Sequence, residues 1–239
     1  MRIAMWSGPR NLITAMMYAF GARGDCAVID EPFYATYLVK TGLEHPMRDE
    51  IIASQSTDPD AVITELLGSV PAQKPHFYQK HMSQHMIAGV SREWVNAMTN
   101  VFLIRHPARV AASFSAKFEN PTLTDIGFVQ QAELYDQLTD QGAQPVVIDS
   151  ADIRRDPKGM LKKLCAAIDL PWDPAMLHWP AGGHADDGVW AAHWYGSVHR
   201  STGFAAAEGP LPILSGEQAR LADAALPFYE KLSAAKLLS

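Results

Sequence analysis

Two stretches of the chain join an apolar run to residues that could bind an anion. The first stretch has Ser7, Gly8, Pro9, Arg10, Asn11 and Thr14 after Arg2–Trp6, and the second has Arg105 and Ser113 after Asn100–Ile104. Each stretch has the pattern of a buried strand, a polar turn and a helix, and the free backbone N–H groups of a helix start attract anions. Two such sites in one chain predict a ligand with two separated anionic groups.

Ionisable side chains follow two further apolar runs. Glu31 comes soon after Cys26–Ile29, and Lys80 and His81 come directly after His76–Gln79. The carboxyl ends of parallel strands meet at one edge of a sheet, so we expect these groups to face the same ligand. Glu31 is a candidate general base, and an ordinary ion-pair partner is the alternative.

The elements that must position these residues alternate between strands and helices. The apolar runs, with a fifth at Gln144–Ile148, lack polar alternation, which is typical of parallel strands buried on both faces. Asp58-Pro59 and Asp156-Pro157 predict two helix starts. These patterns predict an α/β fold with a mainly parallel five-stranded sheet flanked by helices, in a single domain over residues 1–239.

The C-terminal third gives more detailed expectations. The pair Ser215 and Gln218 predicts a capping box, and Pro227 predicts a break or kink in the last helix. We expect a long surface loop over residues 171–188. The histidines of this region match no metal-binding pattern, so we expect no metal site.

Composition limits the classes of partner. The chain has 239 residues and a formal net charge of −6, which argues against broad electrostatic binding to nucleic acid or to an acidic membrane. Apolar runs are too short for a signal peptide or a membrane span, which favours a cytoplasmic protein. We expect Cys26 and Cys165 to be reduced core thiols, and Arg23 and Arg109 to be solvated charges on helix faces.

The first loop also invites comparison with the Walker A motif of nucleotide triphosphatases. Thr14 falls on the Ser/Thr of that motif, but Leu12 and Ile13 occupy its Gly and Lys positions. Without the lysine that contacts the β- and γ-phosphates, a conventional kinase or ATPase is disfavoured.

Taken together, these motifs resemble the sulfotransferases that use 3′-phosphoadenosine 5′-phosphosulfate (PAPS), a family with a P-loop-type three-layer sandwich. Its first loop has the pattern Pro-Lys/Arg-Ser-Gly-Thr/Ser-Thr, and the segment from Pro9 to Thr14 falls in register with it. The family also has an arginine that ends a strand and a serine eight positions later, which match Arg105 and Ser113. The segment 198–204 resembles its glycine-containing basic loop.

The resemblance implies roles for these residues. The first loop, from Ser7 to Asn11, and Thr14 would hold the 5′-phosphosulfate, and Arg10 would stand at the position of the catalytic cation. Arg105 and Ser113, together with Arg200, Ser201, Thr202 and Gly203, would hold the 3′-phosphate. Arg10 and Lys80 would stabilise the charge that develops during transfer.

The general base stays open among Glu31, His81 and His85, with Glu31 favoured because the family's Lys-x-His pattern is out of register here. The implied products are a sulfated small molecule and adenosine 3′,5′-bisphosphate (PAP). We expect the acceptor, a hydroxyl or amine compound, to bind along Tyr34–Pro75. A kinase with a degenerate phosphate loop and a non-catalytic nucleotide-binding protein are the alternatives, and the sequence does not indicate the oligomeric state.

Overall fold

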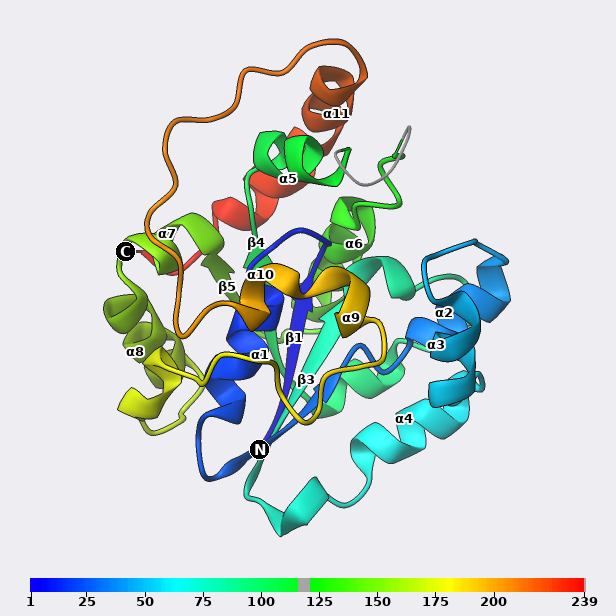
Figure 1. Cartoon of the computed structure of the whole chain (residues 1–239), viewed down its shortest axis with the longest axis vertical. Coiled ribbons are helices and arrows are strands. Elements are labelled where there is room, and N and C mark those ends of the chain that lie inside the picture. The colour runs from blue at the N-terminus through cyan, green and yellow to red at the C-terminus, as the bar shows by residue number, and fades with distance from the viewer. Residues whose placement is uncertain (116–120, 239) are drawn as a thin grey trace.

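A parallel sheet forms the centre of the molecule. The computed structural model describes residues 1–115 and 121–238 (Figure 1). Its described strands are β1 (Arg2–Ser7), β2 (Cys26–Asp30), β3 (His76–Met82), β4 (Thr99–Ile104) and β5 (Val146–Asp149). They lie in the order β2-β3-β1-β4-β5, and every neighbouring pair is parallel. The predicted α/β fold and parallel five-stranded sheet are therefore confirmed.

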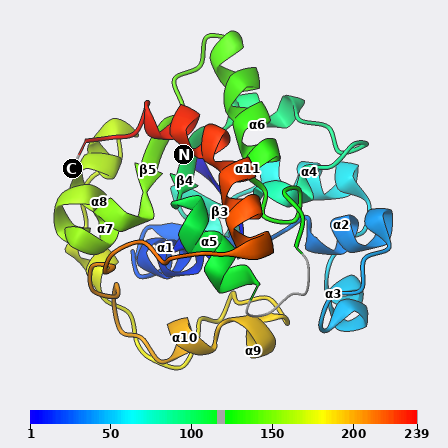
Figure 2. The same cartoon turned by 90° about the horizontal axis from the view of Figure 1, so that it is seen from above.

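Helices connect the strands and cover the sheet (Figures 1 and 2). The described α-helices are α1 (Ile13–Gly21), α2 (Tyr34–Thr41), α3 (Arg48–Ser54), α4 (Pro59–Leu67), α5 (Pro107–Phe114), α6 (Phe128–Asp140), α7 (Ser150–Arg155), α8 (Pro157–Ala167), α9 (Ala191–Trp194), α10 (Gly196–His199) and α11 (Gly216–Ser233). Short 3₁₀ helices are η1 (Pro71–Gln73), η2 (Ser83–His85), η3 (Glu93–Ala97) and η4 (Pro174–Leu177).

The alternation of side chains along β1 divides the core into two layers. Ile3 and Met5 point to one face and pack with residues of α1 and α8. Ala4 and Trp6 point to the other face and pack with residues of α4, α6 and α11. Because successive side chains of a strand point to opposite faces, burial of every residue from Ile3 to Ser7 places β1 in the middle of a three-layer sandwich.

Strand β3 extends beyond its predicted end. The sequence predicts that the strand ends at Gln79, but β3 continues to Met82 because it pairs on both sides, with Asp30 opposite Lys80 and Trp6 opposite His81. Lys80 and His81 are therefore strand residues rather than loop residues. A buried lysine is tolerated inside this strand because acidic side chains neutralise its charge.

The predicted helix starts agree with the structure at two places and differ at a third. The side chains of Asp58 and Asp156 accept backbone N–H bonds at the starts of α4 and α8. Ser215 is the N-cap of α11, but its side chain makes no capping bond, so the capping-box bond is not formed. The helix α11 runs through Pro227 to Ser233, so Pro227 does not break this described helix, and the alternative of a kink stays a prediction.

Two arginines expected on solvated faces are instead held by acids or carbonyls. The side chain of Arg23 is 2% exposed, pairs with Asp25 and donates to the carbonyl of Pro171. Arg109 pairs with Glu208. Asp25 is a local partner of Arg23, but Pro171 and Glu208 belong to later segments that fold against the two arginines, which the local sequence does not reveal.

The two cysteines are buried free thiols, as predicted. The expected loop over residues 171–188 contains η4 and buries Met176 and Trp179, so it is in part a core segment. Among the described helices, none combines the length and the apolar character that a membrane crossing requires.

Candidate functional site

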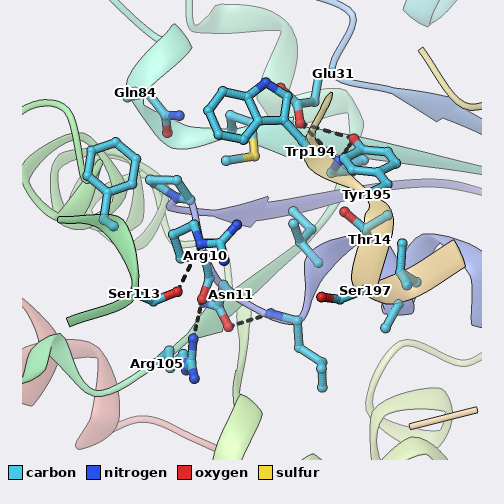
Figure 3. Close-up of a pocket in the computed structure, with 18 of the residues that line it drawn as sticks. Arg10, Asn11, Thr14, Glu31, Gln84, Arg105, Ser113, Trp194, Tyr195 and Ser197 are labelled. Atoms are coloured by element: carbon cyan, nitrogen blue, oxygen red, sulfur yellow. Dashed lines mark hydrogen bonds and ion pairs between the residues drawn. The ribbon is translucent and has the colours of Figure 1, made fainter. Parts of the chain in front are cut away.

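A cavity of about 650 Å³ lies where β1, β2, β3 and β4 end. Its lining includes these residues of the predicted site: Pro9, Arg10, Asn11, Thr14, Glu31, Lys80, His85, Arg105, Ser113, Ser201 and Gly203. Figure 3 shows Arg10, Asn11, Arg105 and Ser113 on one wall, with Glu31, Trp194 and Tyr195 on another. The structure thus brings together residues that are more than one hundred positions apart in the sequence.

The loop after β1 is anchored beneath the cavity. The side chain of Asn11 donates to the carbonyl of Leu103 at 3.0 Å and accepts from the N–H of Leu12 at 2.8 Å. Gly8 is required here, because a Cβ at this position would lie 2.3 Å from the carbonyl oxygen of Ile126. Ser7, the last residue of β1, and Gly8, which follows it, lead into the loop but are not among the residues that line the cavity.

The first turn of α1 faces the cavity. Ile13, Thr14 and Ala15 line it, and the first N–H groups of an α-helix have no acceptor within their own helix. Arg10 adopts a left-handed backbone conformation with φ of 58°, which directs the chain into this turn. The N-terminus of α1 and the Thr14 hydroxyl therefore lie at the cavity, where the sequence predicts the first anion site.

At the predicted second anion site, the start of α5 has fewer free N–H groups than expected, and the predicted side chains Arg105 and Ser113 line the cavity. The ring of His106 accepts the N–H of Ala108 at 3.2 Å, and Pro107 has no N–H, so the start of α5 is already capped. These side chains are linked to the first loop: Arg10 Nε donates to Ser113 Oγ at 2.9 Å, and Arg105 donates to the carbonyl of Arg10. Burial and the neighbouring Arg105 lower the pKa of Arg10.

Glu31 belongs to a buried network of charges. Its Oε1 accepts from Lys80 Nζ at 2.9 Å, and Lys80 also donates to Asp30 Oδ1 at 2.8 Å. Burial raises the pKa of Glu31, and the nearby Asp30 adds to the rise while Lys80 opposes it. Burial would lower the pKa of Lys80, but Asp30 and Glu31 outweigh it and raise that pKa. Lys80 is thus a protonated counter-ion shared by two carboxylates.

Tyr195, a residue that sequence reasoning missed, completes this network. Its hydroxyl contacts Asp30 at 2.8 Å, Glu31 at 3.3 Å and Lys80, and it accepts from Trp190 Nε1 at 2.9 Å. Tyr195 lies between α9 and α10, the two short helices drawn in yellow and orange in front of β1 in Figure 1. No local pattern links this tyrosine to strand ends so far away in the sequence.

The two candidate histidines lie in different surroundings. His81 is 1% exposed, stacks on Trp6 with ring centroids 4.5 Å apart, and is not among the residues that line the cavity. Burial lowers the pKa of His81 to about 3. The prediction that His81 faces the ligand is wrong, because this strand position points into the layer that contains Trp6 and Trp94.

His85, by contrast, lines the cavity. Its ring stacks against Tyr34 and Tyr37, with centroids 4.9 and 4.7 Å away. Burial, and then the neighbouring His45, Lys80 and His81, hold the pKa of His85 well below its ordinary value. Its ring is therefore neutral near pH 7.

The predicted basic loop is only partly at the site. Ser201 and Gly203 line the cavity, but Arg200 is exposed, and neither Arg200 nor Thr202 is among the lining residues. Arg154, at the end of α7, lines the cavity and was not predicted. The sequence feature that could have indicated Arg154 is its position shortly after the fifth predicted strand, Gln144–Ile148.

Comparison with known proteins agrees with this geometry. A family model described as "Sulfotransferase domain" matches residues 1–236. Among curated proteins, "Branched-chain-amino-acid aminotransferase-like protein 1" of Arabidopsis thaliana is 36% identical over 231 residues, which are 96% of this chain and 41% of that protein. The similarly named protein 2 is 35% identical over 202 residues, 84% of this chain and 36% of that protein. The chain therefore spans about two fifths of these relatives.

Solved structures share the fold at low sequence identity. The sulfotransferase domain from the curacin biosynthetic pathway has a TM-score of 0.50 at 15% identity and covers 93% of this chain and 96% of its own. The sulfotransferase domain of the Synechococcus PCC 7002 olefin synthase has a TM-score of 0.51 at 17% identity, with 94% of both chains covered. A sulfotransferase from Alicyclobacillus acidocaldarius has a TM-score of 0.52 at 13% identity, over 73% of this chain and 87% of its own. Because the family model matches residues 1–236 of this chain, the chain belongs to the sulfotransferase domain family.

Proposed function

We propose that this chain, as a single domain over residues 1–239, transfers a sulfuryl group from PAPS to a hydroxyl or amine of a small-molecule acceptor and releases PAP. The observation that carries the proposal is one cavity in which Arg10, Arg105 and Ser113 lie on one wall and Glu31 on another (Figure 3). Anion-binding groups and a candidate base are what sulfuryl transfer to a protonated acceptor requires.

The residues present fit a nucleotide with phosphate groups on both sides of its ribose. The N–H groups at the start of α1 and the Thr14 hydroxyl would hold the 5′-phosphosulfate, and Arg105 with Ser113 would hold the 3′-phosphate. When bound, PAPS supplies an activated sulfuryl group with PAP as its leaving group. The volume of the cavity is within the usual range for small-molecule sites.

Arg10 is proposed to stabilise the negative charge that develops during transfer. Its guanidinium lies in the cavity wall and is fixed by its bond to Ser113. A group held in place in this way stabilises charge without paying for reorganisation during the reaction. The same bond joins Arg10 to Ser113, which is proposed to hold the 3′-phosphate. The residue proposed for the chemistry and a residue proposed for donor binding are therefore in direct contact.

Glu31 is proposed to accept the proton of the acceptor. Its raised pKa makes its carboxylate a stronger base than an exposed glutamate, whereas the depressed pKa of His85 makes that ring a weaker base. Because its ammonium is bound to Asp30 and Glu31, Lys80 is proposed to position Glu31 and to keep it ionised, rather than to stabilise the developing charge as the resemblance implied. His81 has no proposed role in the chemistry.

The acceptor is proposed to bind beside α2. Within the expected segment from Tyr34 to Pro75, the residues that line the cavity are Tyr34, Tyr37, Leu43, Glu44 and His45. Only the first part of that segment therefore supports the proposal. Aromatic and acidic side chains there suit a neutral or cationic compound better than an anionic one.

Thermal unfolding with different nucleotides tests the proposed function. PAP should raise the melting temperature, since a ligand at one hundred times its dissociation constant adds about 2.7 kcal/mol. AMP, which lacks the 3′-phosphate, should stabilise much less. Equal stabilisation by AMP, or stabilisation by ATP with magnesium alone, would contradict the proposal and favour a kinase.

A further inference from the structure

Three arginine side chains converge on one carboxylate beside the cavity. Glu208 Oε1 accepts from Arg154 Nη1 at 2.7 Å and from Arg105 Nη2, and Glu208 Oε2 lies 3.1 Å from Arg109 Nε. The Glu208 side chain is 6% exposed. It lies on the segment between α10 and α11, which passes α7 in Figure 1. These four residues together have an excess of two positive charges.

The four residues do not face the cavity equally. Arg105 and Arg154 line it, whereas Arg109 and Glu208 are not among the lining residues. Glu208 therefore holds the two lining arginines from outside the cavity and does not occupy the place of a ligand. One carboxylate is shared by three guanidinium groups, so the cluster keeps an excess of two positive charges, and two of its three arginines line the cavity. Two guanidinium groups match a phosphate dianion.

The Arg154 side chain is held in place. Its Nε donates to the carbonyl of Ala206 at 2.8 Å, and its Nη1 donates to Glu208. These two bonds fix the plane of the guanidinium, which lowers the conformational entropy that a ligand contact would cost. Arg105 is fixed in the same way by Glu208 and by the carbonyl of Arg10. Both arginines are thus preorganised for an anion.

We propose that Arg154 is a second arginine of the subsite for the donor's 3′-phosphate, and that Glu208 is a positioning residue for Arg105 and Arg154. This assignment rests on the proposed function. Arg154 takes the role that the sequence resemblance gave to Arg200, whose side chain is exposed and outside the cavity lining. The phosphate would then contact Arg105, which follows β4, and Arg154 of α7. The hydroxyl of Ser113 in α5 would be a further donor.

Calorimetric titration with PAP and with AMP tests the assignment, because the two ligands differ in the 3′-phosphate alone. Arg154→Gln should weaken PAP binding by about tenfold or more, the usual loss for a hydrogen bond to a charged group, and leave AMP binding within about twofold. Arg154→Lys should recover part of the PAP affinity. Glu208→Gln should weaken PAP binding by a smaller factor and also leave AMP binding unchanged.

Two exposed arginines serve as matched controls. Arg155→Gln, next in the chain with a side chain that is 61% exposed, and Arg200→Gln should both bind PAP like the wild type. Circular dichroism melts confirm that each variant folds. The assignment fails if Arg154→Gln weakens PAP and AMP equally or affects neither, or if Arg200→Gln gives the loss specific to PAP.

Further outcomes separate the two parts of the assignment from the proposed function. Tighter PAP binding by Glu208→Gln would mean that Glu208 competes with the phosphate, which overturns its positioning role. A wild-type protein that binds AMP as tightly as PAP would overturn the proposed donor itself. A wild-type preference for PAP that survives Arg154→Gln would overturn the role of Arg154 alone.

Discussion

The Lys80 ammonium lies 2.9 Å from Glu31 Oε1, and both side chains are buried where β2 and β3 end. Asp30 shares the same ammonium, so two carboxylates depend on one positive charge. Burial alone would favour the protonated form of Glu31, and its ion pair opposes this. The arrangement keeps a carboxylate of increased basicity at the wall of the cavity.

Replacement of Glu31 tests its proposed role as the base. Glu31→Gln should lower turnover by about 10²–10⁴-fold, the usual weight of general-base catalysis, because the amide keeps the shape and cannot accept the proton. PAP affinity should change little. Turnover is measured as PAP release from PAPS with acceptors found by screening hydroxyl and amine compounds. Glu217→Gln, an exposed acid of α11 that is not among the residues lining the cavity, is the matched control and should retain turnover.

Replacement of His85 shows which result would contradict the role of Glu31 as the base. His85→Asn should cost far less turnover than Glu31→Gln, since burial already makes the His85 ring a weak base. An active Glu31→Gln variant beside an inactive His85→Asn variant with normal PAP binding would assign the base to His85. Glu31 would then be an ion-pair partner of Lys80.

Removal of the Lys80 charge should destabilise the fold. Lys80→Met leaves Asp30 and Glu31 as buried acids without a counter-ion, a change that costs about 3–5 kcal/mol for buried pairs. Urea unfolding measures the loss near pH 7. A second change, Asp30→Asn, should recover part of the stability, because it removes one of the two unpaired charges. Equal stability of Lys80→Met and the wild type would contradict the ion-pair network.

Arg10 and Arg105 should separate chemistry from binding. Arg105→Ala should weaken PAP binding by about 1.5–3 kcal/mol, as expected for loss of a hydrogen bond to a charged group. Arg10→Ala should lower turnover more than PAP affinity, because its contact strengthens as charge develops in the transition state. Calorimetry gives the affinities, and PAP release gives turnover. If Arg10→Ala changed affinity alone, Arg10 would be a binding residue.

The sheet could be predicted from the sequence because its strands are continuous apolar runs. The end of β3 could not, since Lys80 and His81 look like a polar turn until their partners are known. Lys80 is buried because Asp30 lies opposite it on β2, and His81 is buried because Trp6 lies opposite it on β1. A polar residue inside a strand depends on tertiary contacts that no local pattern contains.

The same reason explains which site residues were predicted. Arg10, Glu31 and Arg105 closely follow apolar strands, so strand topology alone brings them to one edge. Tyr195, Arg154 and Glu208 reach the site through the packing of α7 and of segments after α8. The spacing of residues along the chain does not determine such packing.

The buried histidines should make stability depend on pH. Burial lowers the pKa of His81 from 6.5 to about 3, so the unfolded chain binds a proton that the folded protein excludes between these values. This contribution to stability is complete above pH 6.5 and is lost as the pH falls towards 3. Between about pH 7.5 and 5.5 the loss is about 1.4 kcal/mol for one histidine. Urea unfolding at both values should therefore give a smaller pH dependence for His81→Asn than for the wild type. Identical pH dependence in the two proteins would mean that His81 takes up a proton as readily in the folded protein as in the unfolded chain.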